Sequence, residues 1–559
     1  MSDSRQLDEY VARRGLCMVP DPAKGHRTVA TRRFVRGQTV LSINPLYGFP
    51  VRPTEESPAT HADGNDQSPS RPLRGESVDP LTRCVHCFHP LPARYPRCSR
   101  CRQAAQYCSP ACLTAHWNAR HHFECGHLDT EAVDEAAAKL KPEYRPYLRM
   151  AAGVGAALVS AKRKQNGKPG WLQIQAAAWD RLVGHRDMHP QYVLRQYKQI
   201  ASVLVAHVKG TGTLGYVADP SISDADDART DAVVSALCRF GCNNFAAYDY
   251  SAHAVTGHLC SPLASLLFNH SCYPNASFVY SNGLQVVRAL REIREGEEVT
   301  LAYVDGMHPR SVRRKTLADV YFFGCTCTRC EGASERGKVD SLLDGAVDND
   351  TTDTRQTQQP PLLLPSNLPT NYTDHKPPRI DPWVIRVIRG LFCLVNNGTT
   401  TTDDDASSFR KLDTTILDAV KEEPPQNIRF FAYKHWLECQ DECLDKVSEG
   451  HSELWPWACV SSLYVLAFYV MAYPPYHPLV GTQCLEAAKL VWNSMQVSDT
   501  PPVAAVDGSL VKCLVLAAKS VLEVAANLPT VSSSSDSTLL TRQIALLLEQ
   551  LSAGGDSSR

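Results

Sequence analysis

The sequence predicts an α+β protein of several domains. A β-rich core carries a cysteine-rich insertion and a helical insertion, and an all-α C-terminal domain follows it. Short strand-like runs occupy residues 24–46 and return after Cys238, whereas the pattern after Pro382 is helical to near Leu551. Cysteines concentrate between the two β-rich parts, with seven of the 21 in residues 84–125. A chain of 559 residues is also too long for a single hydrophobic core.

The overall composition is that of an ordinary soluble globular protein, with 43% hydrophobic and 21% charged residues. The formal net charge of −1 gives the whole chain no electrostatic preference for nucleic acid, and direct DNA binding is not expected. The first thirty residues contain no apolar stretch of the kind found in a secretory signal. Clustered cysteines without such a signal indicate metal ligands in a reducing compartment rather than disulfide bonds.

The cysteine-rich segment is flanked by two segments of contrasting composition. Before it, residues 52–83 are rich in proline, serine, aspartate and glycine, which predicts a disordered insert after the first strands in residues 1–51. After it, residues 126–230 contain alanine-rich runs with few helix breakers, which predicts helices.

The cysteine-rich segment contains eight potential metal ligands in four closely spaced pairs. In order they are Cys84 and Cys87, Cys98 and Cys101, Cys108 and Cys112, and His121 and Cys125. A spacing of two places both ligands on one turn, and a spacing of three places them one helical turn apart. Eight ligands suffice for two tetrahedral zinc ions. The intervening segments are short and polar, so the metal is expected to supply their folding free energy.

Two details of this zinc site stay open at the level of sequence. An interleaved arrangement would combine the first pair with the third, and the second pair with the fourth. His122 stands next to His121 and could replace it as the ligand.

A second ligand set lies in the middle of the chain. Cys272 follows Asn269 and His270, and about fifty residues later comes the series Cys325, Cys327 and Cys330. Four thiolates suit one further tetrahedral zinc. This zinc would hold the later segment, residues 307–332, against the Asn-His segment beside a polar pocket.

Two strand patterns surround this central motif. Residues 278–287 alternate on both sides of Asn282-Gly283, which predicts a β-hairpin with its turn at Asn-Gly. Residues 298–303 also alternate and predict a strand that includes Tyr303.

The C-terminal third is predicted to be helical. Residues 333–380 are rich in aspartate, threonine and proline and are expected to form a linker. Residues 381–552 suit a stack of antiparallel helices of tetratricopeptide (TPR) type, although no exact repeat is present. Residues 455–473 carry no charge and are long enough to cross a bilayer. Because Pro456 and two serines interrupt this stretch, a buried helix is expected instead, with no membrane partner.

The cysteine-rich segment resembles a MYND zinc finger. The residues that carry the resemblance are the cysteine pairs, the run Tyr107-Cys108-Ser109, Trp117, and the final His-x3-Cys. The resemblance implies a peptide partner, often a proline-rich one. One departure is visible, because three residues separate Trp117 from His121 where the family usually has two.

The central motif resembles a SET domain. The residues concerned are Asn269, His270, Ser271, Cys272, Pro274 and Asn275, then Gly296, Glu297, Glu298 and Val299, then Tyr303. With the finger before it and Cys-x-Cys-x2-Cys behind it, the whole order resembles the SMYD family of SET- and MYND-containing protein lysine methyltransferases. The implied domains are residues 1–51 for the N-terminal part of SET, 84–125 for MYND, 126–230 for a helical SET insert, 231–306 for the SET core, and 307–332 for a post-SET zinc segment.

The resemblance implies methyl transfer from S-adenosylmethionine to a lysine of a histone or another protein. It further implies three zinc ions, a monomer, and residence in nucleus and cytoplasm. Substrate specificity is expected from a groove between the SET core and the C-terminal helices. The implied cofactor-binding residues are Lys24, Gly25, His26, His185, Asn269, His270, Tyr321 and Phe323. The implied catalytic residues are Tyr303 at the point of transfer, and Tyr321 and Phe245 as walls of the lysine channel.

One position departs from the family pattern. Arg27 stands where the family usually has a second glycine, so that a side chain occupies a place where backbone normally approaches the ligand. Arg27 therefore supports an alternative hypothesis, in which the chain is a catalytically weak or inactive SET/MYND scaffold that recruits protein partners in transcriptional regulation.

Overall fold

A computed structural model describes most of the chain. The described residues are 2–51, 83–101, 105–122, 125, 130–162, 170–207, 226–250, 254–332, 335–344, 380–391, 414–416, 418, 430–497, 507–526 and 539–554. The expected disordered insert at residues 52–83 lies outside them except for its last residue. The expected linker at residues 333–380 lies outside them except for Ile380 and residues 335–344, which form a helix.

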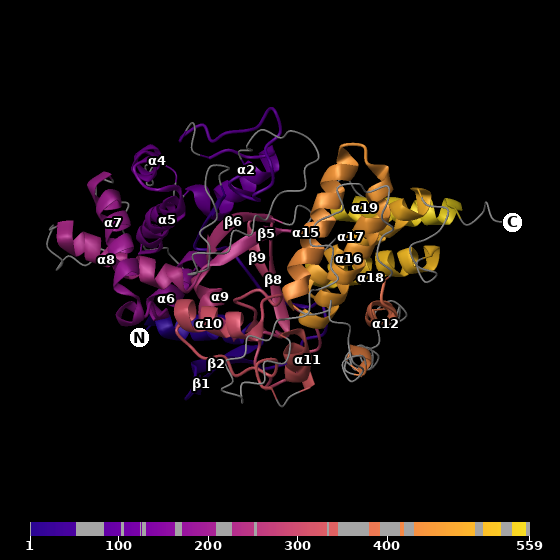
Figure 1. The fold of residues 1–559 in the computed structure, drawn as a ribbon. Helices are drawn as coiled ribbons and strands as arrows, with labels where there is room; N and C mark the ends of the chain where they lie inside the picture. Colours follow the sequence, from indigo (N-terminus) through magenta and orange to yellow (C-terminus); the bar gives the residue numbers. More distant parts are fainter. Residues whose placement is uncertain are drawn as a thin grey trace.

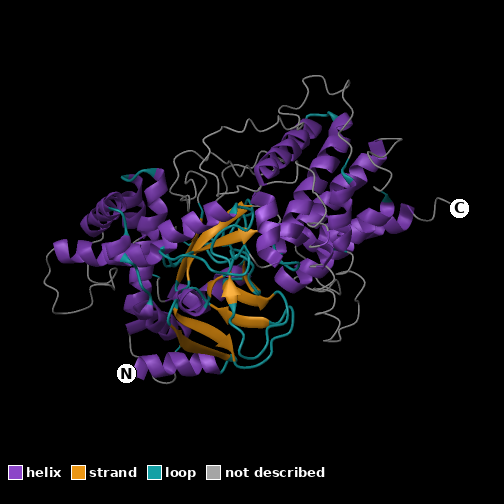
Figure 2. Ribbon diagram, turned by 60° about the horizontal axis from the view of Figure 1, so that its bottom comes forward, coloured by secondary structure: helices purple, strands orange, loops and turns teal. Residues whose placement is uncertain are grey.

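The strands lie in the middle of the molecule, with helices on both sides of them (Figures 1 and 2). The helical insertion (residues 130–241) covers one side, and the helices that follow residue 430 cover the other, shown in orange and yellow in Figure 1. The N-terminus lies beside the strands, and the C-terminus lies at the far end of the C-terminal helices.

The described strands form four small sheets rather than one large sheet. Their bounds are β1 (Leu16–Asp21), β2 (Gly25–Ala30), β3 (Thr39–Ile43), β4 (Tyr47–Pro50), β5 (Phe245–Asp249), β6 (Ala254–Cys260), β7 (Asn269–His270), β8 (Ala276–Ser281), β9 (Leu284–Ala289) and β10 (Thr300–Leu301). The strand orders are β1-β2, β10-β7, β3-β9-β8 and β4-β6-β5. Two of these sheets therefore join strands from before the finger to strands that follow it by more than 100 residues.

The predicted hairpin is present. Strands β8 and β9 pair in antiparallel register, with Ser281 opposite Leu284. Asn282 and Gly283 both have positive φ, at 49° and 80°, as a two-residue turn of this kind requires.

The strand expected over residues 298–303 is shorter than its pattern suggested. Only Thr300 and Leu301 form a strand, and they pair in parallel with Asn269 and His270. Tyr303 lies just beyond the strand, because its backbone N–H donates to the His270 imidazole rather than to another strand.

The described helices before the C-terminal part surround the strands. Their bounds are α1 (Ser2–Ala12), α2 (Pro110–His116), α4 (Thr130–Ala138), α5 (Arg145–Lys162), α6 (Trp171–Arg181), α7 (Gln191–His207), α8 (Asp226–Gly241), α9 (Pro262–Leu267), α10 (Arg310–Tyr321) and α11 (Glu335–Asp344). Short helices η2 (Pro142–Tyr144) and η3 (Arg186–Met188) interrupt the helical insertion. Helix α11 occupies part of the expected linker, because its Val339 and Leu343 are buried against the C-terminal helices.

The finger (residues 83–125) packs against the β-rich core. Phe88 stacks on Tyr280 with ring centroids 4.5 Å apart, and the Arg120 guanidinium donates to the Gly48 carbonyl at 3.1 Å. A Cβ at Gly257 would lie 2.3 Å from the Phe88 ring, so only glycine permits this approach. The finger is thus held by β4, β6 and β8, although the cysteines themselves make up half of its own interior.

The C-terminal part consists of helices α12 (Pro382–Gly390), α15 (Phe430–Ser448), α16 (Trp455–Ala472), α17 (Pro478–Val497), α18 (Gly508–Ala526) and α19 (Leu539–Gly554), with the short η7 (Ser452–Leu454). From α15 to α19, each helix packs against the next one along the chain. The apolar stretch Ser452–Ala472 is long enough to cross a membrane, but 89% of its apolar 18-residue window is buried inside the protein. As expected from the sequence, it forms the central helix of this part.

Polar contacts attach the C-terminal helices to the β-rich core. Arg288 donates to the Val524 carbonyl at 2.7 Å, and Arg36 donates to the Tyr476 hydroxyl at 2.5 Å. Arg329 donates to the Ala472 carbonyl at 2.8 Å. The end of α16 is therefore fixed to the segment that contains the last three cysteines of the central set.

Candidate functional site

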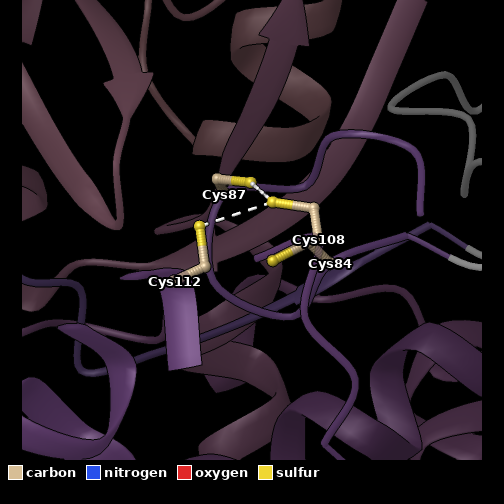
Figure 3. Close-up of side chains that lie close together, drawn as sticks. All are labelled: Cys84, Cys87, Cys108 and Cys112. Atoms are coloured by element: carbon tan, nitrogen blue, oxygen red, sulfur yellow. Dashed lines mark hydrogen bonds between the residues drawn. The ribbon is translucent and has the colours of Figure 1, made fainter. Parts of the chain in front are cut away.

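The eight ligands of the finger form two groups, paired in the interleaved manner. One group consists of Cys84, Cys87, Cys108 and Cys112, whose side chains converge on one point in Figure 3. The other consists of Cys98, Cys101, His121 and Cys125. In each group all ligand atoms lie within 4.8 Å of one another, so each could hold a metal ion.

The separations between ligand atoms fit a tetrahedral zinc. Zn–S bonds of about 2.3 Å in a tetrahedron place sulfur atoms about 3.8 Å apart. The Cys87–Cys108 and Cys108–Cys112 sulfur separations are both 3.5 Å, and the Cys98–Cys125 separation is 3.8 Å. Sulfur and nitrogen donors at these separations are those that zinc prefers.

A local irregularity in the helix decides between His121 and His122. Residues 117–121 form a π-helical turn, in which the His122 N–H bonds to the Trp117 carbonyl. Such a turn absorbs one extra residue in a helix. The longer spacing after Trp117 therefore still places His121 in the ligand group, with its Nε2 3.4 Å from the Cys101 sulfur. The His122 ring instead bonds to the Trp117 carbonyl.

The central cysteine cluster (Cys272, Cys325, Cys327 and Cys330) also forms a group that could hold a metal ion. The Cys272 and Cys330 sulfur atoms are 3.6 Å apart, close to a tetrahedral edge. Three of these cysteines are buried. The cluster packs against Tyr303, Tyr321 and Phe323, so the metal site and the aromatic residues share one core.

The parallel pairing of β7 with β10 brings Asn269 beside the early loop. Its side-chain amide donates to the His26 carbonyl at 2.7 Å and to Glu298 Oε1 at 3.0 Å. The other Glu298 oxygen accepts from Lys24 Nζ at 2.7 Å. The His26 imidazole donates to the Leu266 carbonyl at 2.5 Å. One carboxylate thus joins two of the predicted cofactor-binding residues.

Gly25 leaves open space at this loop. Its φ is +76°, a conformation that disfavours other residues, and a Cβ built on it meets no atom within 4 Å. The backbone here can therefore be approached closely by a ligand.

His270 connects the central cluster to Tyr303. Its Nδ1 accepts the Tyr303 backbone N–H at 3.0 Å, so the proton of the neutral ring resides on Nε2. Nε2 lies 3.1 Å from the Cys272 sulfur and donates to it. Burial lowers the pKa of His270 to about 4, which keeps the ring neutral at physiological pH. The imidazole thus fixes both a metal ligand and the backbone of the predicted transfer residue.

Tyr303 is enclosed by aromatic rings. Its ring lies 5.1 Å from Tyr321, 5.3 Å from His270 and 6.4 Å from Phe323, measured between centroids. Its hydroxyl donates to the Phe268 carbonyl at 2.5 Å, and Tyr321 donates to the Tyr303 carbonyl at 3.3 Å. Burial raises the pKa of Tyr303 above its ordinary value, so the hydroxyl stays protonated.

Phe245 contacts different residues from those that surround Tyr303 and Tyr321, the other predicted catalytic residues. It begins β5, and its ring meets Phe278 edge-on with centroids 5.0 Å apart. It packs with the core of the β-rich part rather than with the rings around Tyr303.

His185 approaches the site through Phe322, a residue that the sequence did not single out. Both have left-handed backbone, with φ of 47° and 60°, and their rings lie 5.3 Å apart. Such strain in two touching residues is typical of functional segments. Phe322 stands between Tyr321 and Phe323, so this contact ties the helical insertion to the aromatic cluster.

Arg27 points away from the predicted cofactor residues. On β2, His26 and Thr28 face the core, and Arg27 alternates to the opposite, exposed side. Its Nε lies 3.9 Å from Asp21. The extra side chain therefore does not occupy the space beside Gly25.

Sequence reasoning also missed Glu298 and Arg329 as functional candidates. Glu298 had been noticed only as part of the Gly296-to-Val299 run. Arg329 stands between two metal ligands, which was a usable signal, but its partners are distant in sequence. It donates to Asp340 and to the Ala472 carbonyl, at 2.9 and 2.8 Å.

Comparison with known proteins agrees with this arrangement. The SET domain family matches residues 29–304. That match runs from β2 past Tyr303 and includes the finger and the helical insertion. The chain is a SET-domain protein.

Curated relatives narrow the class. A histone-lysine N-methyltransferase of Arabidopsis thaliana, ASHR1, is 25% identical over 61% of this chain and 59% of its own. A histone-lysine N-methyltransferase of Homo sapiens, SMYD3, is 31% identical over 49% of this chain and 60% of its own. An N-lysine methyltransferase of Gallus gallus, SMYD2, is 26% identical over 59% of this chain and 64% of its own. The chain thus spans less than two thirds of the length of these relatives. Within the SET class the chain is similar to members of the SMYD family.

Proposed function

We propose that this chain is a protein lysine N-methyltransferase that uses S-adenosylmethionine. The observation that carries the proposal is the convergence of Asn269, His270, Tyr303, Tyr321 and Phe323 at one place, beside open backbone at Gly25. When bound, S-adenosylmethionine would supply an electrophilic methyl group on a positive sulfonium.

The residues present suit that cofactor. Lys24 and Asn269 both bond to Glu298, and Asn269 also bonds to the His26 carbonyl. Gly25, between Lys24 and His26, adds accessible backbone. The faces of Tyr303, Tyr321 and Phe323 favour a positive sulfur or nitrogen nearby. We assign the first set to cofactor binding, together with His270 and, through Phe322, His185.

The attacking lysine must lose its proton before it reacts, since its free pKa is about 10.4. A channel walled by Tyr303 and Tyr321 would favour the neutral amine, because burial lowers the pKa of a lysine. Phe245 packs against Phe278 instead and is not assigned to this wall. The Tyr303 hydroxyl is protonated, and with the Phe268 carbonyl it provides polar groups that can orient the amine. Methyl transfer to nitrogen is an in-line displacement, so positioning is the main catalytic contribution of these residues.

The three cysteine-containing groups are proposed to hold zinc, because cysteine and histidine donors at tetrahedral separations suit that ion. All twelve ligands come from the protein, which leaves no open coordination position for a reactant. The zinc ions would therefore be structural and take no part in the transfer.

The remaining assignments rest on the family. The substrate is proposed to be a lysine of a histone or of another protein, and the finger to bind a proline-rich peptide. The helices from α12 to α19 are proposed to form a TPR-like domain, the protein to be a monomer, and its location to be nuclear and cytoplasmic.

A two-step experiment tests the enzyme against the scaffold alternative. Calorimetry would measure S-adenosylmethionine binding to the zinc-loaded chain, and radiolabel transfer into a protein extract would then measure activity. Tyr303→Phe is expected to bind the cofactor with little change and to lose at least about 100-fold in transfer. Cofactor binding without transfer in the wild type would support the scaffold instead.

The structure weakens the argument that favoured the scaffold. That argument rested on Arg27, whose side chain is on the exposed side of β2 near Asp21.

A further inference from the structure

A carboxylate stands at the surface next to the proposed site of transfer. Asp305 follows Tyr303 by two residues, which span at most about 7 Å of chain. Tyr303 belongs to the buried aromatic cluster, whereas Asp305 is exposed. A polypeptide whose lysine reached Tyr303 would therefore pass close to this carboxylate.

The Asp305 carboxylate is held in a fixed orientation. Its Oδ1 accepts from the Tyr473 hydroxyl and from the Met307 backbone N–H, the latter at 2.9 Å. Tyr473 is itself stacked on His477, with centroids 4.5 Å apart and an angle of 12° between the rings. Among the described residues, no donor bonds to Oδ2 and no lysine or arginine forms an ion pair with Asp305.

Tyrosines from two domains surround this carboxylate. Tyr469 meets Tyr473 edge-on at 5.3 Å, and its hydroxyl lies 3.3 Å from that of Tyr433. Burial raises the pKa of Tyr248, on β5, and the nearby Tyr469 hydroxyl and Asp305 carboxylate raise it further. Tyr469 and Tyr473 are buried, whereas Tyr248 and Tyr433 are partly exposed, so the latter two are the rings that a ligand could touch.

This combination of groups selects for positive charge. The face of an aromatic ring attracts a cation, and a carboxylate oxygen without a donor accepts a charged hydrogen bond. Both repel an anion. Since no cation of the described residues satisfies Asp305, a cation supplied by a ligand would complete the site.

We propose that Asp305 and the partly exposed rings of Tyr248 and Tyr433 form a subsite for a second cationic side chain of the substrate, with the buried Tyr469 and Tyr473 holding these groups in place. That side chain is a lysine or arginine within a few residues of the lysine to be methylated. The inference rests on the proposed function and adds to it a rule of substrate choice. In the opposing view, Asp305 only links the two domains through Tyr473, and substrate charge would make no difference.

A peptide series distinguishes these views. Each peptide has one central lysine in a neutral sequence and a single arginine at one of the three positions on either side. A matched series carries citrulline, which has nearly the same shape without the charge. At one or two positions, arginine is expected to raise kcat/KM about tenfold over citrulline, mostly through KM. Equal rates for both series at every position would overturn the proposal.

Two charge-matched variants locate the effect. Asp305→Asn is expected to bring the arginine-to-citrulline ratio close to one. Asp319→Asn removes an equally negative, exposed side chain that pairs with Lys315, and it should keep the ratio. The same ratio in Asp305→Asn as in the wild type would contradict the proposal.

A third pair of variants tests the rings independently of Asp305. Tyr433→Phe keeps the ring and should retain most of the ratio, whereas Tyr433→Leu should reduce it. Equal arginine-to-citrulline ratios of kcat/KM in these two variants would show that the tyrosine ring does not contribute to the subsite.

Binding of the same peptides with norleucine in place of the central lysine, measured by fluorescence anisotropy, separates the two proposals. Arginine-dependent binding without any methyl transfer would end the proposed function and leave the subsite standing. Transfer without charge dependence would end the subsite alone.

Discussion

The finger and the central cysteine cluster use the same ligand chemistry for different ends. All eight finger ligands come from residues 84–125, and the ligand cysteines make up half of the finger's own core. The central cluster joins Cys272 to three cysteines more than fifty residues later, and it is built into the aromatic core around Tyr303. Metals bound in the finger would therefore stabilise a local segment, whereas a metal bound in the central cluster would position distant segments against each other.

The partners of the two kinds of site show the same contrast. In the finger, Phe88 and Arg120 attach the zinc-binding segment to the outside of the β-rich core. In the central cluster, His270 joins Cys272 to Tyr303, and Arg329 joins it to the end of α16. Loss of a metal should thus have local consequences in one place and catalytic consequences in the other.

The largest difference in activity is expected between two variants, each of which lacks one metal ligand in one of the two sites. Cys327→Ser should release one zinc, lower stability and reduce transfer by about 100-fold or more, because the segment carrying Tyr321 and Phe323 loses its attachment. Cys84→Ser should also release zinc but keep transfer to a peptide within about threefold. Metal content by mass spectrometry and radiolabel transfer measure both. An equal loss of activity in the two variants would contradict the view that only the central cluster supports catalysis.

Next in size is the buried ion network beside the central cluster. Arg329 and Arg313 share the carboxylate of Asp340, and all three side chains are almost completely buried. Arg329→Met would leave the Ala472 carbonyl without its donor and is expected to reduce the free energy of unfolding by about 3–5 kcal/mol.

The matched control for this network lies on α10. Lys315→Met removes an exposed ion pair with Asp319 and should cost no more than about 1 kcal/mol. Urea unfolding of the C-terminal helices measures both variants. A small effect of Arg329→Met would show that the domains are held by other contacts.

The contrast also explains what could be predicted from sequence. Ligand spacing and the Asn282-Gly283 turn act over a few residues. The hairpin was therefore predicted correctly, and the predicted ligands lie together in groups that could hold a metal ion. Tyr303 was expected on a strand, but its backbone follows the His270 ring, a contact made only after β7 and β10 pair. Patterns within a short stretch of sequence contain no information about the pairing of β7 with β10.

Two further features were out of reach for the same reason. The contact of His185 with Phe322 needs left-handed backbone in two segments more than 130 residues apart. The π-helical turn before His122 was visible only as an unexplained spacing, although it leaves His121 within the ligand group.

A third prediction concerns the link between metal and catalysis. His270→Gln removes the donor to Cys272 and the acceptor for Tyr303, and it should lower both the zinc affinity of the central site and the transfer rate by about 10–100-fold. The finger should keep its two zinc ions. Competition with a chromophoric chelator reports the release of zinc site by site. Full transfer activity together with weaker zinc binding would show that His270 supports the metal site but is not needed to position Tyr303.

The smallest effect is expected at Arg27, where the sequence had suggested the largest doubt about cofactor binding. Arg27→Gly restores the residue usual in the family, but the arginine faces solvent and lies 3.9 Å from Asp21, so little should change at the cofactor. The affinity of the Arg27→Gly variant for S-adenosylmethionine, measured by calorimetry, should stay within about threefold of wild type. The free energy of unfolding should fall by about 1 kcal/mol, because glycine weakens a strand.

Lys24→Ala is the matched comparison on the same loop. It removes the contact with Glu298, which also holds Asn269, and should weaken cofactor binding more than Arg27→Gly does. A large gain in affinity from Arg27→Gly would mean that the arginine reaches the cofactor after all. The function of the early loop would then depend on a contact between Arg27 and the cofactor that forms only when the cofactor binds.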